Sequence, residues 1–105
     1  MKISSFARQV YRLTATIPRG RVASYGGIAR ALKRPGAARA VGNALNENSF
    51  APEVPCHRVV LSTGEVGGYA EGSAKKIARL KKEGVAVKKG KINLKKYAYK
   101  FPAER

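Results

Sequence analysis

Proline residues divide this 105-residue chain into short segments, which limits the folds that it can adopt. Pro18 ends the first apolar segment, Pro35-Gly36 interrupts the second, and Pro52 with Pro55 excludes regular structure between them. Proline lacks a backbone N–H and clashes with the preceding helical turn, so a helix stops near each of these positions. We therefore expect short elements in one domain, residues 1–105, with a modest core.

The segment before Pro18 predicts an amphipathic helix. Ser4 or Ser5 can cap it, because a serine side chain accepts a hydrogen bond from a free N–H of the first turn. Its apolar residues recur at helical spacing: Phe6, Val10, Leu13 and Ile17.

Two further helices, joined by the break at residues 33–36, predict a helix-turn-helix. The first has Ser24 as its cap and extends through Leu32, and the second begins near Ala37 with the sequence AARAVGNALNEN. In such a motif the second helix lies in a groove of DNA.

The second of these helices has an unusual face, in which small residues surround one long cation, Arg39. Those small residues are Ala38, Ala40 and Gly42. They would let the helix backbone approach a narrow groove closely, but they would equally allow close packing of helix against helix. The pattern alone leaves both interpretations open.

The rest of the chain predicts less regular structure. HRVVLSTGEVGGY indicates a strand, a turn at residues 62–64 and a glycine-rich loop that ends at Tyr69. Ser73 is expected to cap a last helix, which Gly84 closes. Residues 85–87 and 92–94 favour a small β-hairpin. The predicted fold class is mostly α with this hairpin, a winged-helix-like helix-turn-helix domain.

Charge narrows the choice of partner. The chain has 22 Lys+Arg against 6 Asp+Glu, a formal net charge of +16 at pH 7, which is typical of proteins that bind nucleic acid. Most lysines of residues 75–100 are interpreted as a solvated surface. No apolar run is long enough for a membrane span, and MKISSFARQVYR lacks the apolar stretch of a signal peptide. We expect an intracellular protein, cytoplasmic and nucleoid-associated or nuclear, with no membrane association.

The only cysteine and the only histidine are adjacent, as Cys56 and His57 in VPCHRVV. One Cys and one His cannot complete a four-ligand zinc site, so no metal is expected. A thiolate is a strong nucleophile, and histidine is the side chain that accepts a proton near neutral pH. On a strand these two side chains would point to opposite faces, so a bridging water or a turn after Pro55 would have to connect them. Arg58 either forms a structural pair or favours the thiolate, and both remain open.

A carboxylate usually orients such a histidine through its other ring nitrogen. The residues alone leave six candidates for this role: Glu47, Glu53, Glu65, Glu71, Glu83 and Glu104.

PCHRVV resembles the active-site motif of the O6-alkylguanine-DNA alkyltransferases, also called methylated-DNA–protein-cysteine methyltransferases, which repair DNA by direct reversal. Further blocks resemble the same family in the same order: IPRGRVASYGGIARAL, AARAVGNAL, the loop at Asn48, STGEVGGY and the KKEGV that ends at Val85. The resemblance covers nearly the whole chain from Phe6. It implies irreversible transfer of an alkyl group from O6-alkylguanine in double-stranded DNA to Cys56, once per molecule and without a cofactor.

The resemblance also implies a role for each matching catalytic residue. Cys56 is the acceptor, His57 deprotonates it through a water, and Glu83 orients His57. Asn48 braces the loop between the active site and the DNA-binding helices. Tyr25 assists the departure of guanine, which gathers negative charge as it leaves.

Contacts to DNA and substrate follow in the same way. An alkyl group on O6 is inaccessible inside a duplex, so the nucleotide must be flipped out, and Arg39 is expected to fill the vacated stack. The expected DNA contacts beside it are Ala38, Ala40, Gly42 and Ser24. The expected substrate pocket includes Tyr69, Ala70 and Val59. Ala70 stands where many members have serine, which implies an altered alkyl preference.

Two alternatives remain. The alkyltransferase-like proteins are equally short but replace the acceptor cysteine, usually with tryptophan; they bind damage and recruit excision repair. A helix-turn-helix regulator would bind a specific sequence regardless of guanine alkylation. The presence of Cys56 favours the enzyme over these alternatives. We also expect a monomer. The N-terminal domain that often precedes this one in the family is expected to be absent.

Overall fold

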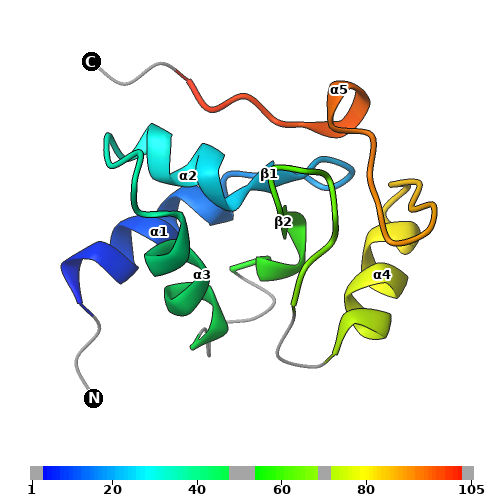
Figure 1. Cartoon of the computed structure of the whole chain (residues 1–105), viewed down its shortest axis with the longest axis horizontal. Helices are drawn as coiled ribbons and strands as arrows, with labels where there is room; N and C mark the ends of the chain where they lie inside the picture. The colour runs from blue at the N-terminus through cyan, green and yellow to red at the C-terminus, as the bar shows by residue number, and fades with distance from the viewer. Residues whose placement is uncertain (1–3, 48–53, 69–71, 103–105) are drawn as a thin grey trace.

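The structure is a computed structural model that describes residues 4–47, 54–68 and 72–102. Helices α1, α2 and α3 lie together on one side, α4 lies on the other, and two short strands run between them (Figure 1). The mostly helical class predicted from the sequence is confirmed. Among the described residues, no helix is long and apolar enough to cross a membrane.

Helix α1 (Ser5–Ala15) begins where the sequence predicts. The Ser4 side chain accepts a hydrogen bond from the Ala7 N–H at 3.0 Å, so Ser4 is its cap. The helix buries Val10, Tyr11 and Thr14 against the core.

Helices α2 (Tyr25–Ala31) and α3 (Ala38–Asn46) form the predicted helix-turn-helix. The Ser24 side chain caps α2 by accepting a hydrogen bond from the Gly27 N–H at 2.8 Å. In the turn, Lys33 adopts a left-handed conformation with φ 62°, which reverses the chain before α3. The Tyr11 hydroxyl of α1 donates to the Ala44 carbonyl of α3 at 2.7 Å and joins these two helices.

Strands β1 (Ala23–Ser24) and β2 (Val59–Val60) pair in parallel, Ala23 with Val59 and Ser24 with Val60. A 3₁₀ helix, η1 (Cys56–Arg58), leads into β2. The strand expected from His57 onward therefore needs correction, because its first residues form a turn and it begins only at Val59. Cys56 lies near Tyr25, the first residue of α2, and contributes to the raised pKa of the Tyr25 hydroxyl.

Helix α4 (Ser73–Lys82) differs at its start from the expectation. Gly72, with φ 97°, is the N-cap, and Ser73 is already inside the helix. The Ser73 hydroxyl instead donates to the Gly67 carbonyl at 3.4 Å. At the other end Glu83 is the C-cap, and Gly84 follows in a left-handed conformation with φ 93°, as expected for a closing glycine.

The predicted hairpin of residues 85–87 and 92–94 also needs correction. Its turn is present, with an antiparallel bridge between Lys88 and Lys91, but Lys91 also bridges Glu65 of an earlier turn. Residue 94 begins a short helix, α5 (Leu94–Tyr97). The Asn93 side chain accepts from the Lys95 N–H at 3.0 Å, and this local cap replaces strand pairing.

Strand β2 separates two hydrophobic clusters. Val59 packs with the residues of α1, α2 and α3, whereas Val60 packs with Leu80 of α4 and with the C-terminal segment. Successive strand side chains point to opposite faces, so two adjacent valines serve both cores. The residues just before β2 are thereby held between the helix-turn-helix and α4.

Candidate active site

Cys56 and His57 lie in the 3₁₀ helix η1 and not in a strand. In this conformation adjacent side chains need not point to opposite faces. The Arg58 N–H donates to the Pro55 carbonyl at 2.9 Å and closes this turn. Cys56 is a free, half-buried thiol, while His57 is buried with 5% of its surface exposed. A partly accessible nucleophile therefore stands next to a base that is shielded from water.

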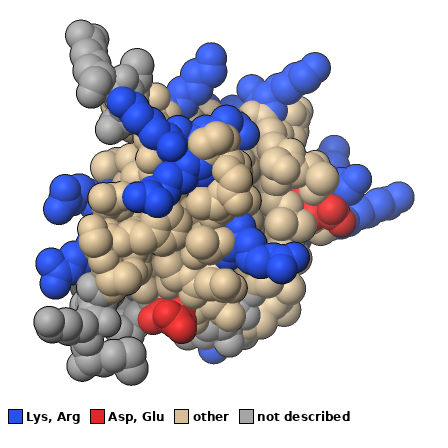
Figure 2. Space-filling view, turned by 60° about the vertical axis from the view of Figure 1, so that its left-hand side comes forward, with Lys and Arg blue, Asp and Glu red and all other residues tan. Residues whose placement is uncertain are grey.

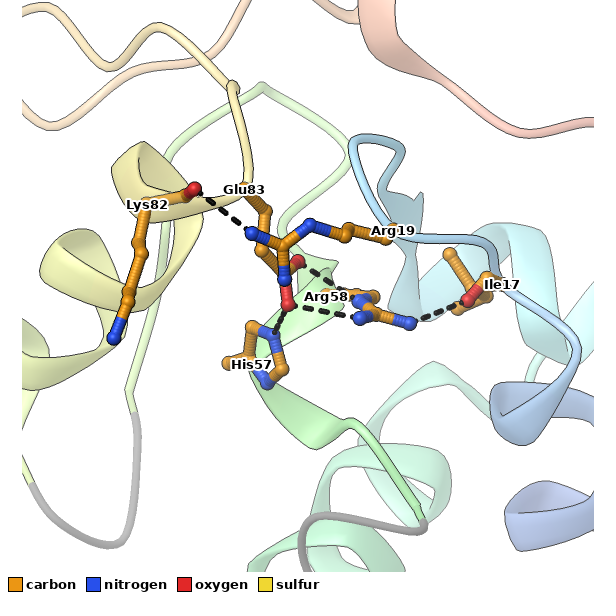
Figure 3. Close-up of polar contacts among 6 residues, drawn as sticks. All are labelled: Ile17, Arg19, His57, Arg58, Lys82 and Glu83. Atoms are coloured by element: carbon orange, nitrogen blue, oxygen red, sulfur yellow. Dashed lines mark hydrogen bonds and ion pairs between the residues drawn. The ribbon is translucent and has the colours of Figure 1, made fainter.

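A carboxylate meets the far side of the imidazole. His57 Nε2 lies 2.9 Å from Glu83 Oε2, which reaches it from the C-terminal end of α4 (Figure 3). The loop of residues 18–21 packs closely against this end of α4. Gly20 has φ 88°, and a Cβ there would come within 3.3 Å of the Glu83 carbonyl. A glycine at this position allows the close approach.

Arg58 holds Glu83 in place with two parallel hydrogen bonds. Its Nε donates to Glu83 Oε1 at 2.9 Å and its Nη2 to Oε2 at 2.8 Å, while Nη1 donates to the Ile17 carbonyl at 2.8 Å (Figure 3). Such a bidentate pair fixes orientation as well as charge. Of the two readings left open for Arg58, the structure shows the pairing.

The electrostatics of this trio fix the tautomer of His57. Burial alone would raise the pKa of Glu83, but hydrogen bonds from Arg58 and His57 lower that pKa to about 2. An ionised carboxylate only accepts hydrogen bonds, so the His57 Nε2 carries the proton and the lone pair of neutral His57 is on Nδ1. Burial lowers the pKa of His57, and Glu83 partly opposes this shift. At neutral pH His57 is thus ready to accept a proton at Nδ1.

Tyr25, at the start of α2, lies between two glycines. A Cβ on Gly42 of α3 would lie 3.8 Å from the Tyr25 ring, and one on Gly67 would lie 3.7 Å from it. Burial, and then the nearby Cys56, raise the pKa of Tyr25, so the hydroxyl stays protonated at neutral pH.

Lys76 is the functional candidate that the sequence interpretation missed, since it was counted with the solvated lysines. It is completely buried on α4, and its Nζ donates to the Gly68 carbonyl at 3.0 Å and to the Tyr25 hydroxyl at 3.4 Å. Burial lowers its pKa to about 8, and a negative charge on Cys56 would oppose that shift. Helical spacing does contain a signal, because Lys76 shares a face with Ile77 and Leu80, which pack in the core.

The residues expected to contact DNA cluster on the helix-turn-helix. Arg39 and Ala40 are exposed on α3, and Ala38 is half-buried. Gly42 faces the Tyr25 ring, so its small size serves packing as well. Figure 2 shows many basic and few acidic side chains on one face of the molecule. Ser24 uses its oxygen to cap α2, and its contact with DNA stays a prediction.

One expected pocket residue needs correction. Val59 has no exposed surface and pairs with Ala23 inside the core, so its side chain cannot touch a substrate in this structure. Three other expected site residues, Asn48, Tyr69 and Ala70, lie outside the described residues. In the part of the chain that is described, no group of three or more His, Cys, Asp or Glu residues could hold a metal ion.

Comparison with known proteins agrees with the resemblance found in the sequence. Residues 5–85 match the family model "6-O-methylguanine DNA methyltransferase, DNA binding domain". The methylated-DNA–protein-cysteine methyltransferase of Shigella flexneri is 48% identical over 79 residues, which are 75% of this chain and 46% of that protein. The chain thus spans less than half the length of this relative.

Solved structures show the same fold. Atl1 of S. pombe, in complex with damaged DNA containing O6-carboxymethylguanine, has a TM-score of 0.84 at 34% identity; the match covers 95% of this chain and 99% of Atl1. OGT of Mycobacterium tuberculosis in complex with DNA has a TM-score of 0.76 at 43% identity, over 79% of this chain and 51% of that one. With a family model matched over most of its length and relatives of this similarity, the chain belongs to the 6-O-methylguanine DNA methyltransferase family.

Proposed function

We propose that this chain repairs DNA by transferring an alkyl group from O6 of guanine, in a duplex, to the sulfur of Cys56. The observation that carries this proposal is the hydrogen-bonded pair of His57 and Glu83 beside a free thiol. Family membership and the name of the Shigella relative support the same reaction.

The chemistry begins with a proton transfer. His57 takes the thiol proton of Cys56 at Nδ1 through a water, and Glu83 stabilises the imidazolium that forms, because its carboxylate already holds the Nε2 proton. The thiolate then attacks the alkyl carbon in line with the C–O bond. A C–S bond forms, the C–O bond breaks, and its electron pair leaves with the guanine.

The departing guanine needs a proton, and Tyr25 is the proposed donor. Its hydroxyl is protonated at neutral pH, and the Lys76 ammonium at 3.4 Å would stabilise the tyrosinate that remains. Because the sulfur ends as a thioether, each molecule acts once. The base-covering role of Tyr69, the alkyl preference tied to Ala70 and the bracing role of Asn48 remain part of this proposal.

Access to the substrate would come from the helix-turn-helix. Arg39 is exposed on α3, where it could enter the stack that a flipped-out nucleotide vacates. The net charge of +16 at pH 7 would attract the DNA backbone at any sequence. We further propose a monomer that acts inside the cell, where its substrate is found.

Mass spectrometry tests the reaction directly. The chain is mixed with a duplex oligonucleotide that contains O6-methylguanine, digested and analysed. We expect one added methyl group on the peptide that contains Cys56, and none in Cys56→Ser. An unmodified thiol in a protein that binds this duplex would refute the transfer.

One observation favours a second candidate, a damage sensor that recruits excision repair without transfer. The match to Atl1 extends over 95% of this chain and 99% of Atl1, whose structure holds O6-carboxymethylguanine DNA. The same experiment separates the two, since a sensor would bind the alkylated duplex more tightly than the unmodified one and keep its thiol unmodified.

A further inference from the structure

A pocket of about 610 Å³ opens on the Glu83 side of His57. Its floor is formed by the relay itself, His57, Glu83 and Arg58, and its walls are the loop before β1 and one face of α4. Among the described residues, neither Cys56 nor Tyr25 nor any residue of α3 lines it. The pocket is therefore separate from the thiol and from the proposed DNA-binding helix.

The walls of the pocket are basic. Lys75, Arg79 and Lys82 follow one another along a single face of α4, and Arg19 stands opposite them. The Arg19 guanidinium is held at the rim, because Nη2 donates to the Lys82 carbonyl at 3.1 Å (Figure 3). Cations in the last helical turn offset the helix dipole, but Lys75 is in the first turns and Arg19 is on another segment.

The one carboxylate among the described residues that line the pocket is already paired with other groups. Glu83 already forms its ion pairs with Arg58 and His57, at 2.8 Å and 2.9 Å. Within the described residues, the ammonium groups of Lys75 and Lys82 contact no carboxylate and no other acceptor. Within the described residues, the cations of Arg19, Lys75 and Lys82 thus come from two segments around a concave space whose one carboxylate, Glu83, is already paired.

We propose that this pocket binds a phosphate group, with Arg19, Lys75 and Lys82 as its ligands. Phosphate oxygens accept several charge-assisted hydrogen bonds at once, and a planar guanidinium together with two exposed ammonium groups suits them. A smaller pocket beside α5 also contains lysines, but it has no buried charged group at its base. The phosphate can be a free anion or a phosphodiester of DNA.

A phosphate bound in the pocket would change the protonation of His57. Glu83, Arg58 and Arg79 already act on the charge of His57, and two of these, Arg58 and Arg79, disfavour its protonated form. A bound phosphate would counter those two cations and favour the imidazolium. Binding is therefore visible at His57 without any measurement of transfer.

The chain offers a direct probe, since His57 is its only histidine. Proton NMR follows the imidazole resonances while pyrophosphate is added at constant ionic strength. We expect a saturable shift of these resonances and an increase in the pKa of His57. Lys75→Gln/Lys82→Gln should weaken the binding at least about tenfold, because two charged ligands are lost.

The control removes the same charge elsewhere. Lys88→Gln/Lys89→Gln neutralises two exposed lysines outside the pocket and should leave the affinity for pyrophosphate nearly unchanged. If both double variants lost the same affinity for pyrophosphate, the binding would be non-specific attraction to a basic protein, and the proposal would be overturned. Imidazole resonances that do not move on addition of pyrophosphate would overturn it as well. Thermal unfolding verifies that both variants are folded.

Unmodified duplex DNA then identifies the source of the phosphate. If the duplex displaces pyrophosphate from the wild-type pocket, a DNA phosphodiester is the ligand. If both bind together, and the His57 resonances still follow pyrophosphate, the ligand is a free anion. The phosphate site does not depend on alkyl transfer, so failure of one proposal leaves the other intact.

Discussion

The Lys76 ammonium lies 3.4 Å from the Tyr25 hydroxyl oxygen, although Lys76 has no exposed surface. Burying a cation is costly unless it is hydrogen-bonded, and here the Gly68 carbonyl at 3.0 Å supplies the second contact. A lysine in this position makes Tyr25 a better proton donor, because it stabilises the tyrosinate. Burial of the Lys76 ammonium costs free energy of folding, but it places a cation where the proposed proton transfer from Tyr25 needs one.

The first prediction concerns this pair. Lys76→Met keeps most of the side-chain volume and removes the charge, so the tyrosinate loses its stabilising cation. Single-turnover transfer from a methylated duplex should slow by about tenfold to a hundredfold, less than for removal of a direct oxyanion donor. The free energy of unfolding should stay level or rise, because no charge is buried. Lys81→Met, on the exposed side of α4, is the control, and equal rates for the two variants would limit Lys76 to a structural role.

The second prediction is a rise in stability in mildly alkaline solution. The pKa of Lys76 is about 8 in the folded chain, against an ordinary value of 10.5. Between these values the unfolded chain binds more protons, so the free energy of unfolding increases with pH. Tyr25, whose pKa is raised above 10.0, opposes this only at higher pH. Denaturant unfolding should show that, from about pH 8 to pH 10, the free energy of unfolding of the wild type increases relative to that of Lys76→Met. If the two free energies changed with pH in parallel, the lowered pKa of Lys76 would be contradicted.

Local features of the sequence were sufficient to predict α1, α2, α3 and the end of α4, but not the cap of α4 or the short helix α5. Ser4 and Ser24 cap their helices through side-chain contacts three residues away, which a linear pattern reveals directly. Gly84 likewise closes α4 by its own conformation. The mostly helical class and the helix-turn-helix followed from such short-range signals.

Long-range pairing was not accessible in this way. Val59 pairs with Ala23, and nothing in either segment marks this parallel match. Without the pairing, the sequence does not show that the strand begins only at Val59, and the 3₁₀ helix at His57 is indistinguishable from the start of a strand. Similarly, spacing could not select Glu83 from six acids; only the family resemblance singled it out. Lys76 was missed because lysine is so rarely buried, although its helical face pointed to the core.

The third prediction addresses the relay. In Glu83→Gln the neutral amide no longer stabilises the imidazolium, so transfer of the thiol proton from Cys56 to His57 should become less favourable. The pH profile of single-turnover transfer should shift upward. The pKa of His57, followed by NMR, should fall further, because Glu83 is one of the groups that raise it. Glu65→Gln, which removes an exposed acid, should change neither curve. An unchanged profile would remove Glu83 from the mechanism.

The last prediction separates DNA opening from chemistry. Arg39 is exposed on α3 and takes no part in the His57–Glu83 hydrogen bond, so its role should appear only when a base must leave the helix. Flipping costs a few kcal/mol, and losing the side chain that fills the stack should slow transfer from a saturating methylated duplex at least about tenfold in Arg39→Ala. Transfer from free O6-benzylguanine requires no flipping and should keep its rate. Arg12→Ala removes an equal charge from α1 and should weaken duplex binding modestly without slowing bound transfer. Equal losses on duplex and free base in Arg39→Ala would show that the arginine supports the fold or the thiol, and the stack-filling role would be abandoned.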